Sequence, residues 1–191
     1  MPTSRGDDDA VTASALAAGA GDRDALEQFI RSTQRDVWRL VAHLAEAGVA
    51  DDLTQDVYLR ALRSLPGFEG RSSARTWLLS IARRTVVDHV RAAVVRPSIS
   101  WYADYEQASD TGQAADHSRS AGFEDVVELN LMLAGLAPER REALLLTQVL
   151  GLSYAEAAEV CGCPVGTVRS RVSRAREDLV NGRDHEDVDV I

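Results

Sequence analysis

Lysine is absent from this 191-residue sequence, because all 21 of its basic residues are arginine. Acidic residues outnumber them at 30, which gives a formal net charge of −9. A chain with this charge is on average repelled by polyanions such as nucleic acids. This charge balance excludes a uniformly basic protein that coats nucleic acid. Any contact with a phosphate backbone must come from local clusters of arginine.

Cysteine and long hydrophobic runs are also scarce. The two cysteines, Cys161 and Cys163, are too close together for a disulfide framework, which indicates a reducing cytosol. The longest stretch without a charged residue is the 13 residues 143–155, shorter than the roughly 20 residues of a membrane-spanning helix. Asp7, Asp8 and Asp9 stand where a secretory signal would be basic. We therefore predict no membrane segment and no secretory signal.

The charge is distributed in blocks that suggest a domain organisation. Residues 23–96 carry twelve arginines against nine acids, whereas each of the other blocks is net acidic. The segment 97–122 is rich in Ser, Asp, Gln, Ala and Gly and has no sustained hydrophobic period, which is typical of a linker. The sequence therefore predicts a disordered acidic tail (1–22), a first module (23–96), a flexible acidic linker (97–122), a second module (123–183) and an acidic tail (184–191).

Both modules have the hydrophobic spacing of α-helices, with apolar residues every three or four positions. In the first module the three stripes are Leu26, Phe29, Ile30, Thr33, Val37, Leu40, Val41 and Leu44; then Leu53, Val57, Ala61, Leu62 and Leu65; then Leu78, Ile81, Ala82, Thr85 and His89. Asp51 and Asp52 are expected to cap the second helix, and Ser72 and Ser73 mark the start of the third. In the second module we expect helices near 123–135, 139–150, 153–161 and 165–180. No strand pattern is found, so the predicted fold is all-α, with two small helical domains joined by the linker.

Residues 153–176 are the most specific motif in the sequence. Ala158 is small where two helices would cross, and Gly162 follows at the position of a sharp turn. The following helix has an apolar stripe formed by Val165, Val168, Val172, Ala175 and Leu179. Its other side carries Gly166, Thr167, Arg169, Ser170, Ser173 and Arg174, and Arg171 and Arg176 flank them. No acid lies between Gly166 and Arg176. This pattern predicts a helix-turn-helix whose last helix enters the major groove of DNA.

The first module contains a different candidate site for nucleic acid. A loop with glycine begins at Phe68 and leads into a helix, and residues 71–96 hold six arginines against one acid. Ser80, Arg84, Val87 and Arg91 share one strip of that helix, and Trp77 lies at its start. A loop and a basic helix of this kind can hold a strand backbone and cradle an unstacked base. A plain core position for Trp77 is the alternative.

A third candidate surface is acidic and consists of Asp51, Asp52, Gln55 and Asp56. Capping a helix uses one or two carboxylates, so the third carboxylate is surplus to that role. The surface suits a basic protein partner, and capping with solubility is the alternative explanation.

Together these motifs resemble the bacterial sigma factors of the sigma-seventy family, and most of all the compact extracytoplasmic-function (ECF) group, which keeps only two conserved domains. The runs Arg-Ser-Ser-Ala-Arg-Thr-Trp-Leu-Leu and Leu-Leu-Leu-Thr-Gln-Val-Leu-Gly-Leu-Ser-Tyr are similar to the actinobacterial C-type members of this group. The resemblance implies a factor without cofactor, metal or catalytic residues that binds core RNA polymerase and promoter DNA in the cytosol and directs transcription initiation. An anti-sigma factor is a further partner that it allows.

The resemblance also assigns residues to the three surfaces. Asp51, Asp52, Gln55 and Asp56 correspond to the grip on core polymerase. Reading and melting of the downstream (minus-ten) promoter element is assigned to Arg71, Ser72, Arg75, Trp77, Arg84, Asp88 and Arg91. Reading of the upstream (minus-thirty-five) element is assigned to Thr167, Arg169, Ser170, Arg171, Arg174 and Arg176. The sequence departs from many relatives at Arg84, where they carry Asn, and from some at Ser173, where they carry an aromatic residue.

Two other classes of function fit the sequence less well. A response-regulator-type activator also ends in a helix-turn-helix, but its receiver domain needs alternating strands and an acidic pocket, and residues 23–96 show neither. An enzyme is disfavoured because the four histidines are scattered and no nucleotide-binding or nucleophile motif occurs. Cys161 and Cys163 could form a redox or metal site, but structural zinc takes four ligands, so packing of the turn is the favoured interpretation.

Overall fold

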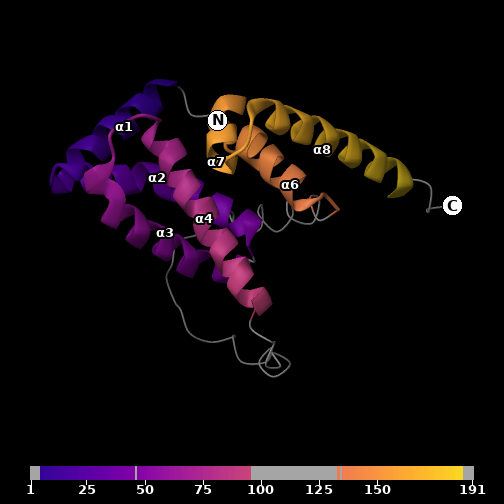
Figure 1. Ribbon diagram of the computed structural model, residues 1–191, viewed down its shortest axis with the longest axis horizontal. Helices are drawn as coiled ribbons and strands as arrows, with labels where there is room; N and C mark the ends of the chain where they lie inside the picture. The colour runs from indigo at the N-terminus through magenta and orange to yellow at the C-terminus, as the bar shows by residue number, and fades with distance from the viewer. Residues whose placement is uncertain (1–4, 46, 96–132, 134, 187–191) are drawn as a thin grey trace.

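The computed structural model describes residues 5–45, 47–95, 133 and 135–186. These residues form helices and no strand, in two helical modules (Figure 1). The all-α prediction is therefore confirmed. The predicted linker (97–122) and most of the helix expected at 123–135 lie outside the described residues, as does the end of the C-terminal tail.

Four α-helices build the first module: α1 (Arg5–Gly19), α2 (Arg23–Leu44), α3 (Ala50–Ser64) and α4 (Ala74–Val95). Short 3-10 turns, η1 (Ala47–Val49) and η2 (Leu65–Gly67), precede and follow α3. The predicted stripes form the core, since Phe29, Val37 and Leu40 of α2 and Val57 of α3 are buried. Two positions differ, because Leu62 and His89 are exposed.

The capping predictions have mixed outcomes. Ser73 caps α4, since its Oγ accepts a hydrogen bond from the Thr76 N–H at 3.1 Å. Asp51 and Asp52 lie in the first turn of α3, but the residue that precedes this helix is Val49, and no side chain caps it. The Asp51 carboxylate instead accepts a 2.9 Å hydrogen bond from the Trp38 indole. The prediction that Asp51 and Asp52 cap α3 is therefore wrong: their carboxylates lie on its first turn.

The N-terminal prediction also needs correction. Residues 1–22 were expected to be a disordered acidic tail, but Arg5–Gly19 form helix α1, which packs against α2, α4 and η2. Val11 and Ala15 of this helix are buried. Asp7 and Asp8 lie in its first turn, where carboxylates interact favourably with the helix dipole. The acidic cluster that suggested a tail is thus the start of a helix.

The second module contains α6 (Pro138–Leu144), α7 (Tyr154–Cys161) and α8 (Val165–Glu186). The helix expected at 139–150 changes type after Leu144, because Leu145–Val149 form a π-helical turn. In that turn the Leu150 N–H donates to the Leu145 carbonyl five residues earlier, at 3.0 Å. Helix α8 continues to Glu186, so it takes up the first residues of the predicted acidic tail.

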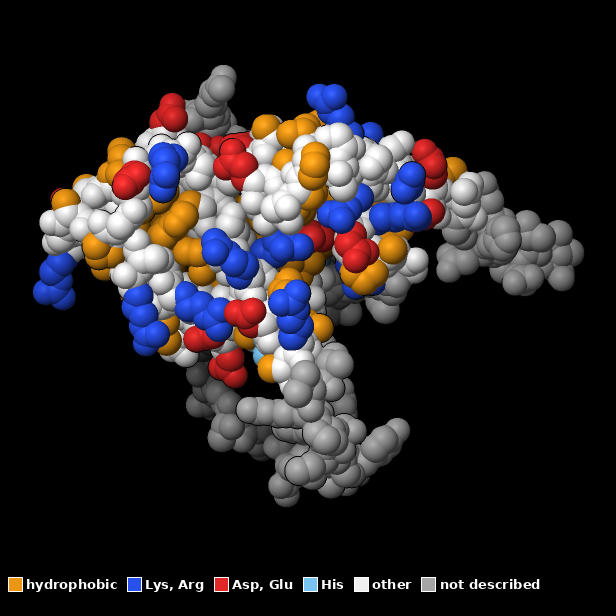
Figure 2. Space-filling view, in the orientation of Figure 1, with side chains coloured by type: hydrophobic (Ala, Val, Ile, Leu, Met, Phe, Trp, Pro, Cys, Tyr) orange, Lys and Arg blue, Asp and Glu red, His pale blue; other side chains and the backbone are white. Residues whose placement is uncertain are grey.

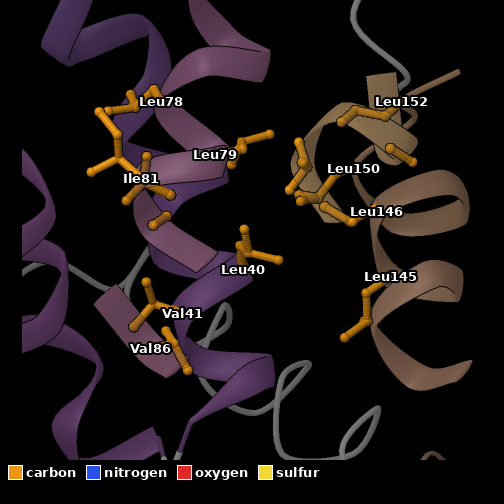
Figure 3. Close-up of a cluster of buried hydrophobic side chains, with 14 of the residues drawn as sticks. Leu40, Val41, Leu78, Leu79, Ile81, Val86, Leu145, Leu146, Leu150 and Leu152 are labelled. Atoms are coloured by element: carbon orange, nitrogen blue, oxygen red, sulfur yellow. The ribbon is translucent and has the colours of Figure 1, made fainter. Parts of the chain in front are cut away.

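The two modules pack against each other. Helix α7 lies against α4, and the π-helical turn contacts α2. Figure 3 shows Leu40 and Leu79 of the first module facing Leu146, Leu150 and Leu152 of the second. All five side chains are buried. The described residues therefore share a hydrophobic core that continues across the boundary between the modules.

Candidate nucleic-acid interface

Helices α7 and α8 form the helix-turn-helix that the sequence predicts. A capping box starts α7: the Ser153 hydroxyl accepts from the Glu156 N–H at 3.2 Å, and the Glu156 carboxylate accepts from the Ser153 N–H at 2.8 Å. Gly162 ends α7 in the left-handed conformation, with φ 64° and ψ 38°. A residue with a Cβ adopts that conformation at a cost, which explains glycine at this turn.

The outer face of α8 is exposed, and its predicted apolar stripe is buried except at Val165, which is 37 % exposed, and at Leu179, which is half-buried. Val168, Val172 and Ala175 are buried, whereas Arg169, Ser170 and Arg174 are exposed. Ser173 is exposed on the same face, and Thr167, Arg171 and Arg176 border it. Packing against the first module leaves this arginine face accessible to a ligand. Figure 2 shows arginine side chains along α8 and over α4.

Local contacts hold several of these side chains in place. The Arg169 guanidinium lies 5.8 Å from the centre of the Tyr154 ring, within the range of a cation–π contact. Arg176 donates to the Gln148 side chain at 3.0 Å. Arg171 leans back toward the turn, where it lies 3.8 Å from the sulfur of Cys163. The arginines of α8 are thus partly pre-positioned by residues of α7 and the turns.

The basic strip on α4 is present, and it continues into the preceding loop. Arg84 and Arg91 are exposed, and Ser80 and Val87 on the same strip are half-buried. At the start of the helix the half-buried Trp77 packs against Phe68 with ring centroids 4.9 Å apart. Arg71 and Ser72 lie in this loop, where the Arg71 Nε is 3.4 Å from Glu69. These residues occupy one continuous edge of the first module.

Arg75 differs from the other residues predicted for the downstream strip. Its side chain is 7 % exposed and forms a 2.6 Å ion pair with Asp36 of α2. It also donates to the carbonyl oxygen of Leu150 at 2.5 Å. In this arrangement the Arg75 guanidinium lies at the boundary between the modules and away from the exposed strip.

The acidic start of α3 is exposed and continues into an apolar patch. Asp51, Asp52 and Gln55 are exposed, and Asp56 is half-exposed. Two turns further along the same helix, Leu59 is 50 % exposed and Leu62 is 37 % exposed. Sequence reasoning placed Leu62 in a buried stripe, and it did not single out Leu59, which lies outside that stripe.

An arginine connects this surface with the strip on α4. Arg60 lies 3.3 Å from Asp56 and 2.9 Å from Asp88. The hydrogen bond to Asp88 and the charge of Asp56 raise the pKa of the Arg60 guanidinium. Asp88 is therefore held by an arginine of the neighbouring helix at the edge of the candidate DNA strip.

A second ion pair at the module boundary also escaped the sequence analysis. Arg83 of α4 donates to Glu142 of α6 through Nε at 2.5 Å and through Nη2 at 3.2 Å. The Glu142 side chain is 9 % exposed. No spacing in the sequence signals these contacts, since the partners come from separate modules.

Cys161 is the last residue of α7, and Cys163 lies in the turn between α7 and α8. Cys161 is buried and Cys163 is half-buried. Burial raises the pKa of the Cys161 thiol to about 12. Among the residues that the structure describes, no group of three or more His, Cys, Asp or Glu side chains is placed to hold a metal ion. None of the described helices has the length and apolarity needed for a membrane crossing.

Comparison with protein families divides the chain as the structure does. Residues 29–94 match the family model described as "Sigma-70 region 2". Residues 127–179 match the model described as "Sigma-70, region 4". The first match covers α2 to α4, with the acidic surface and the basic strip, and the second covers the helix-turn-helix.

Individual relatives extend the similarity to the whole chain. The ECF RNA polymerase sigma factor SigC of Mycobacterium tuberculosis is 54 % identical over 188 residues, which cover 98 % of this chain and 99 % of the relative. The sigma factor RpoE of Bartonella quintana, solved in complex with the anti-sigma factor NepR, is 27 % identical with a TM-score of 0.61, covering 81 % of this chain and 93 % of that one. CnrH, solved with the cytosolic domain of CnrY, shares the fold with a TM-score of 0.69 at 24 % identity, over 92 % of this chain and 98 % of that one. The chain therefore belongs to the sigma-70 family, and within it to the ECF RNA polymerase sigma factors.

Proposed function

We propose that this sigma factor divides promoter recognition between the two arginine-bearing faces of its modules and binds core RNA polymerase through the start of α3. The observation that carries the proposal is the presence, on one chain, of two separate exposed basic surfaces and one exposed acidic-apolar surface. A response-regulator activator is not favoured, because region 2 of a sigma factor matches residues 29–94, where a receiver domain would lie.

The outer face of α8 reads the upstream promoter element as a duplex. Arg169, Ser170 and Arg174 are exposed on one side of a helix whose other side is buried. Arginine can bind guanine through two hydrogen bonds in the major groove, and short hydroxyl side chains allow close approach. Thr167, Arg171 and Arg176 border this face, where they suit contacts with phosphates.

The edge formed by the Phe68–Ser73 loop and α4 captures the downstream element as a single strand. Arg84 and Arg91 offer charge to the phosphates, and Arg71 and Ser72 border the loop. Trp77 supports the loop by packing on Phe68. Asp88, held by Arg60, lies within the same strip. We assign Arg75 to contact between the modules, because its guanidinium is buried against Asp36 and the Leu150 carbonyl.

The start of α3 is the docking surface for core polymerase. Asp51, Asp52, Gln55 and Asp56 give it a charge that suits a basic partner. The exposed Leu59 and Leu62 add apolar area next to the charged residues, an arrangement typical of protein interfaces. Trp38 fixes the Asp51 carboxylate at the edge of this surface.

Sigma factors in general are not enzymes, and this chain performs no covalent chemistry of its own in the mechanism proposed. It acts in the bacterial cytosol and joins the nucleoid as part of the holoenzyme, because both of its targets, polymerase and promoter DNA, are there. An anti-sigma factor is a further partner: RpoE of Bartonella quintana is solved with one, and the exposed apolar positions on α3 would suit such a protein.

Run-off transcription tests the proposal. Purified core polymerase is incubated with a genomic promoter library, with and without the protein. We expect new transcripts from a specific set of fragments only when the protein is present. If core polymerase with the protein transcribes no fragment better than core polymerase alone, the proposed function is refuted.

A further inference from the structure

We propose that helix α1 holds the segment Leu65–Ala74 in its conformation. In this proposal Thr12, Leu16 and Gly19 are positioning residues for capture of the downstream promoter base. The inference rests on the proposed function, in which this segment holds the melted strand. It assigns a role to a part of the chain that precedes the region 2 match, which begins at residue 29.

The first contact is at the end of the segment, where α4 begins. The backbone N–H of Ala74 donates to the Thr12 hydroxyl at 3.0 Å. The same hydroxyl donates to the Asp8 carbonyl at 2.8 Å. Because the hydroxyl is used both as donor and as acceptor, its orientation is fixed. Thr12 therefore satisfies an N–H at the start of α4 that has no partner within its own helix.

The second contact is in the middle of the loop. Gly70 has a φ of 70°, a conformation that residues with a Cβ rarely adopt. A Cβ built on Gly70 would lie 3.6 and 3.7 Å from the two methyl groups of Leu16. The Leu16 side chain thus lies directly over the backbone at the position where the loop turns. Leu16 is 44 % exposed, so this contact lies at the surface of the module.

The third contact is at the beginning of the segment, in η2. A Cβ built on Gly19 would lie 2.7 Å from the backbone oxygen of Leu65 and 3.4 Å from its carbonyl carbon. Real Cβ atoms do not approach backbone oxygen so closely, so glycine is required here for the end of α1 to reach η2. Leu65 itself is buried.

The three contacts come from one face of α1. Thr12, Leu16 and Gly19 are spaced four and three residues apart, which places them on one side of a helix. They meet the segment at its end, its middle and its beginning, in that order. The loop that carries Phe68, Arg71 and Ser72 therefore belongs to a segment that α1 contacts at both ends and in the middle. A site that reads a base by shape needs such support, because small displacements weaken the discrimination between bases.

The experiment compares Thr12→Val with Thr12→Ser in the holoenzyme. The probe is a single-stranded oligonucleotide with the downstream element of a promoter found by run-off transcription, together with versions in which each base is replaced in turn. We expect Thr12→Val to reduce the ratio of affinities between the native and the replaced base about fivefold, the effect of losing one hydrogen bond at a helix start. Thr12→Ser keeps the hydroxyl and should keep the ratio.

A second pair of variants tests the role of α1 without changing the Thr12 hydroxyl. Gly19→Ala places a methyl group against the Leu65 carbonyl and should also reduce discrimination. Gly67→Ala is its control in the same segment, because a Cβ there meets no heavy atom within 4 Å beyond its chain neighbours. Circular dichroism and core-polymerase binding are measured for all four variants. A loss of folding would lower all binding, whereas a displaced loop changes the ratio for the downstream bases and leaves upstream duplex binding unchanged.

The outcomes separate the two proposals. Wild-type protein that cannot distinguish bases in the downstream strand would overturn the proposed function, and the role of α1 with it. Wild-type protein that discriminates while Thr12→Val and Gly19→Ala discriminate equally well would overturn the role of α1 alone. The same holds if Thr12→Ser is as impaired as Thr12→Val, since the hydroxyl would then not be the cause.

Discussion

Arg83 and Glu142 join the two modules through a two-pronged ion pair, with Nε–Oε1 and Nη2–Oε2 distances of 2.5 and 3.2 Å. One residue belongs to the helix proposed to melt DNA, and the other belongs to the module proposed to read the upstream element. Because Glu142 is buried, removal of Arg83 leaves a carboxylate without its charge partner in a poorly solvated place. The pair therefore stabilises the closed arrangement of the free protein, in which the two modules pack against each other.

Arg83→Gln is expected to shift the free protein toward an open arrangement, in which the two modules no longer pack against each other. Loss of the pair should cost the closed form about 2–3 kcal/mol, the lower end of the range for interfacial charge pairs, since the Arg83 side chain keeps 26 % exposure. Small-angle X-ray scattering should report a larger radius of gyration.

The matched control for this variant is Arg140→Gln. It removes an ion pair with Asp178 of the same length, 2.5 Å, but within the second module. Its radius of gyration should match that of the wild type. An Arg83→Gln protein as compact as both would show that the apolar contacts and the Arg75–Leu150 hydrogen bond keep the modules together without this ion pair.

Asp52→Arg combined with Asp56→Arg should abolish binding to core polymerase while the fold survives. Both side chains are on the surface, so the free energy of unfolding should change little. Placing like charges against a basic partner should cost about 2 kcal/mol or more in binding. Pull-down of core polymerase measures the effect. Asp24→Arg with Glu27→Arg makes the same change in net charge on exposed positions of α2 and should bind as the wild type does.

Arg174→Ala should weaken binding of the holoenzyme to upstream-element duplex by about 1–3 kcal/mol, the usual size of a base-reading arginine contact. The exposed Arg31 on α2 gives a control with the same loss of charge. Titrations at several salt concentrations separate base reading from general attraction to phosphate. Equal affinity of the Arg174→Ala and Arg31→Ala proteins for the cognate sequence would contradict the assignment of α8.

Cys161→Ser with Cys163→Ala should retain promoter activity, because the two residues pack the turn. In the wild type, iodoacetamide at pH 8 should label Cys163 before Cys161, which is buried with a pKa near 12. Mass spectrometry identifies the labelled residue. Stoichiometric zinc in the wild type, lost together with activity in the double variant, would show that the cysteines bind metal.

The raised pKa of Cys161 also predicts a dependence of stability on alkaline pH. Burial raises this pKa from 9.0 to about 12, so the folded protein keeps a proton that the unfolded chain releases above pH 9. The resulting stabilisation is fully present below pH 9 and is lost as the pH rises from about 9 to about 12. Urea unfolding at pH 8 and pH 10 should show a smaller loss of stability for Cys161→Ala than for the wild type.

The amino-acid sequence by itself determined the local structure of this protein. Spacings of three and four in the apolar residues predicted α2, α3, α4 and α8, and Gly162 marked the turn of the helix-turn-helix. The exposed arginine face of α8 was predictable from the same spacing, because the positions of the buried residues of a helix also fix which residues lie on its opposite side. Such features depend on residues within about two turns of one another.

The tertiary structure alone decided which charges are free and which are used inside the fold. Arg75 and Arg84 look alike in the sequence, yet Arg75 is buried against Asp36 and Leu150, residues 39 and 75 positions away. The same applies to Asp7–Asp9, which suggested a disordered tail but begin a helix that packs on α2 and α4. These outcomes depend on which distant surfaces pack together, and local periodicity does not encode that choice.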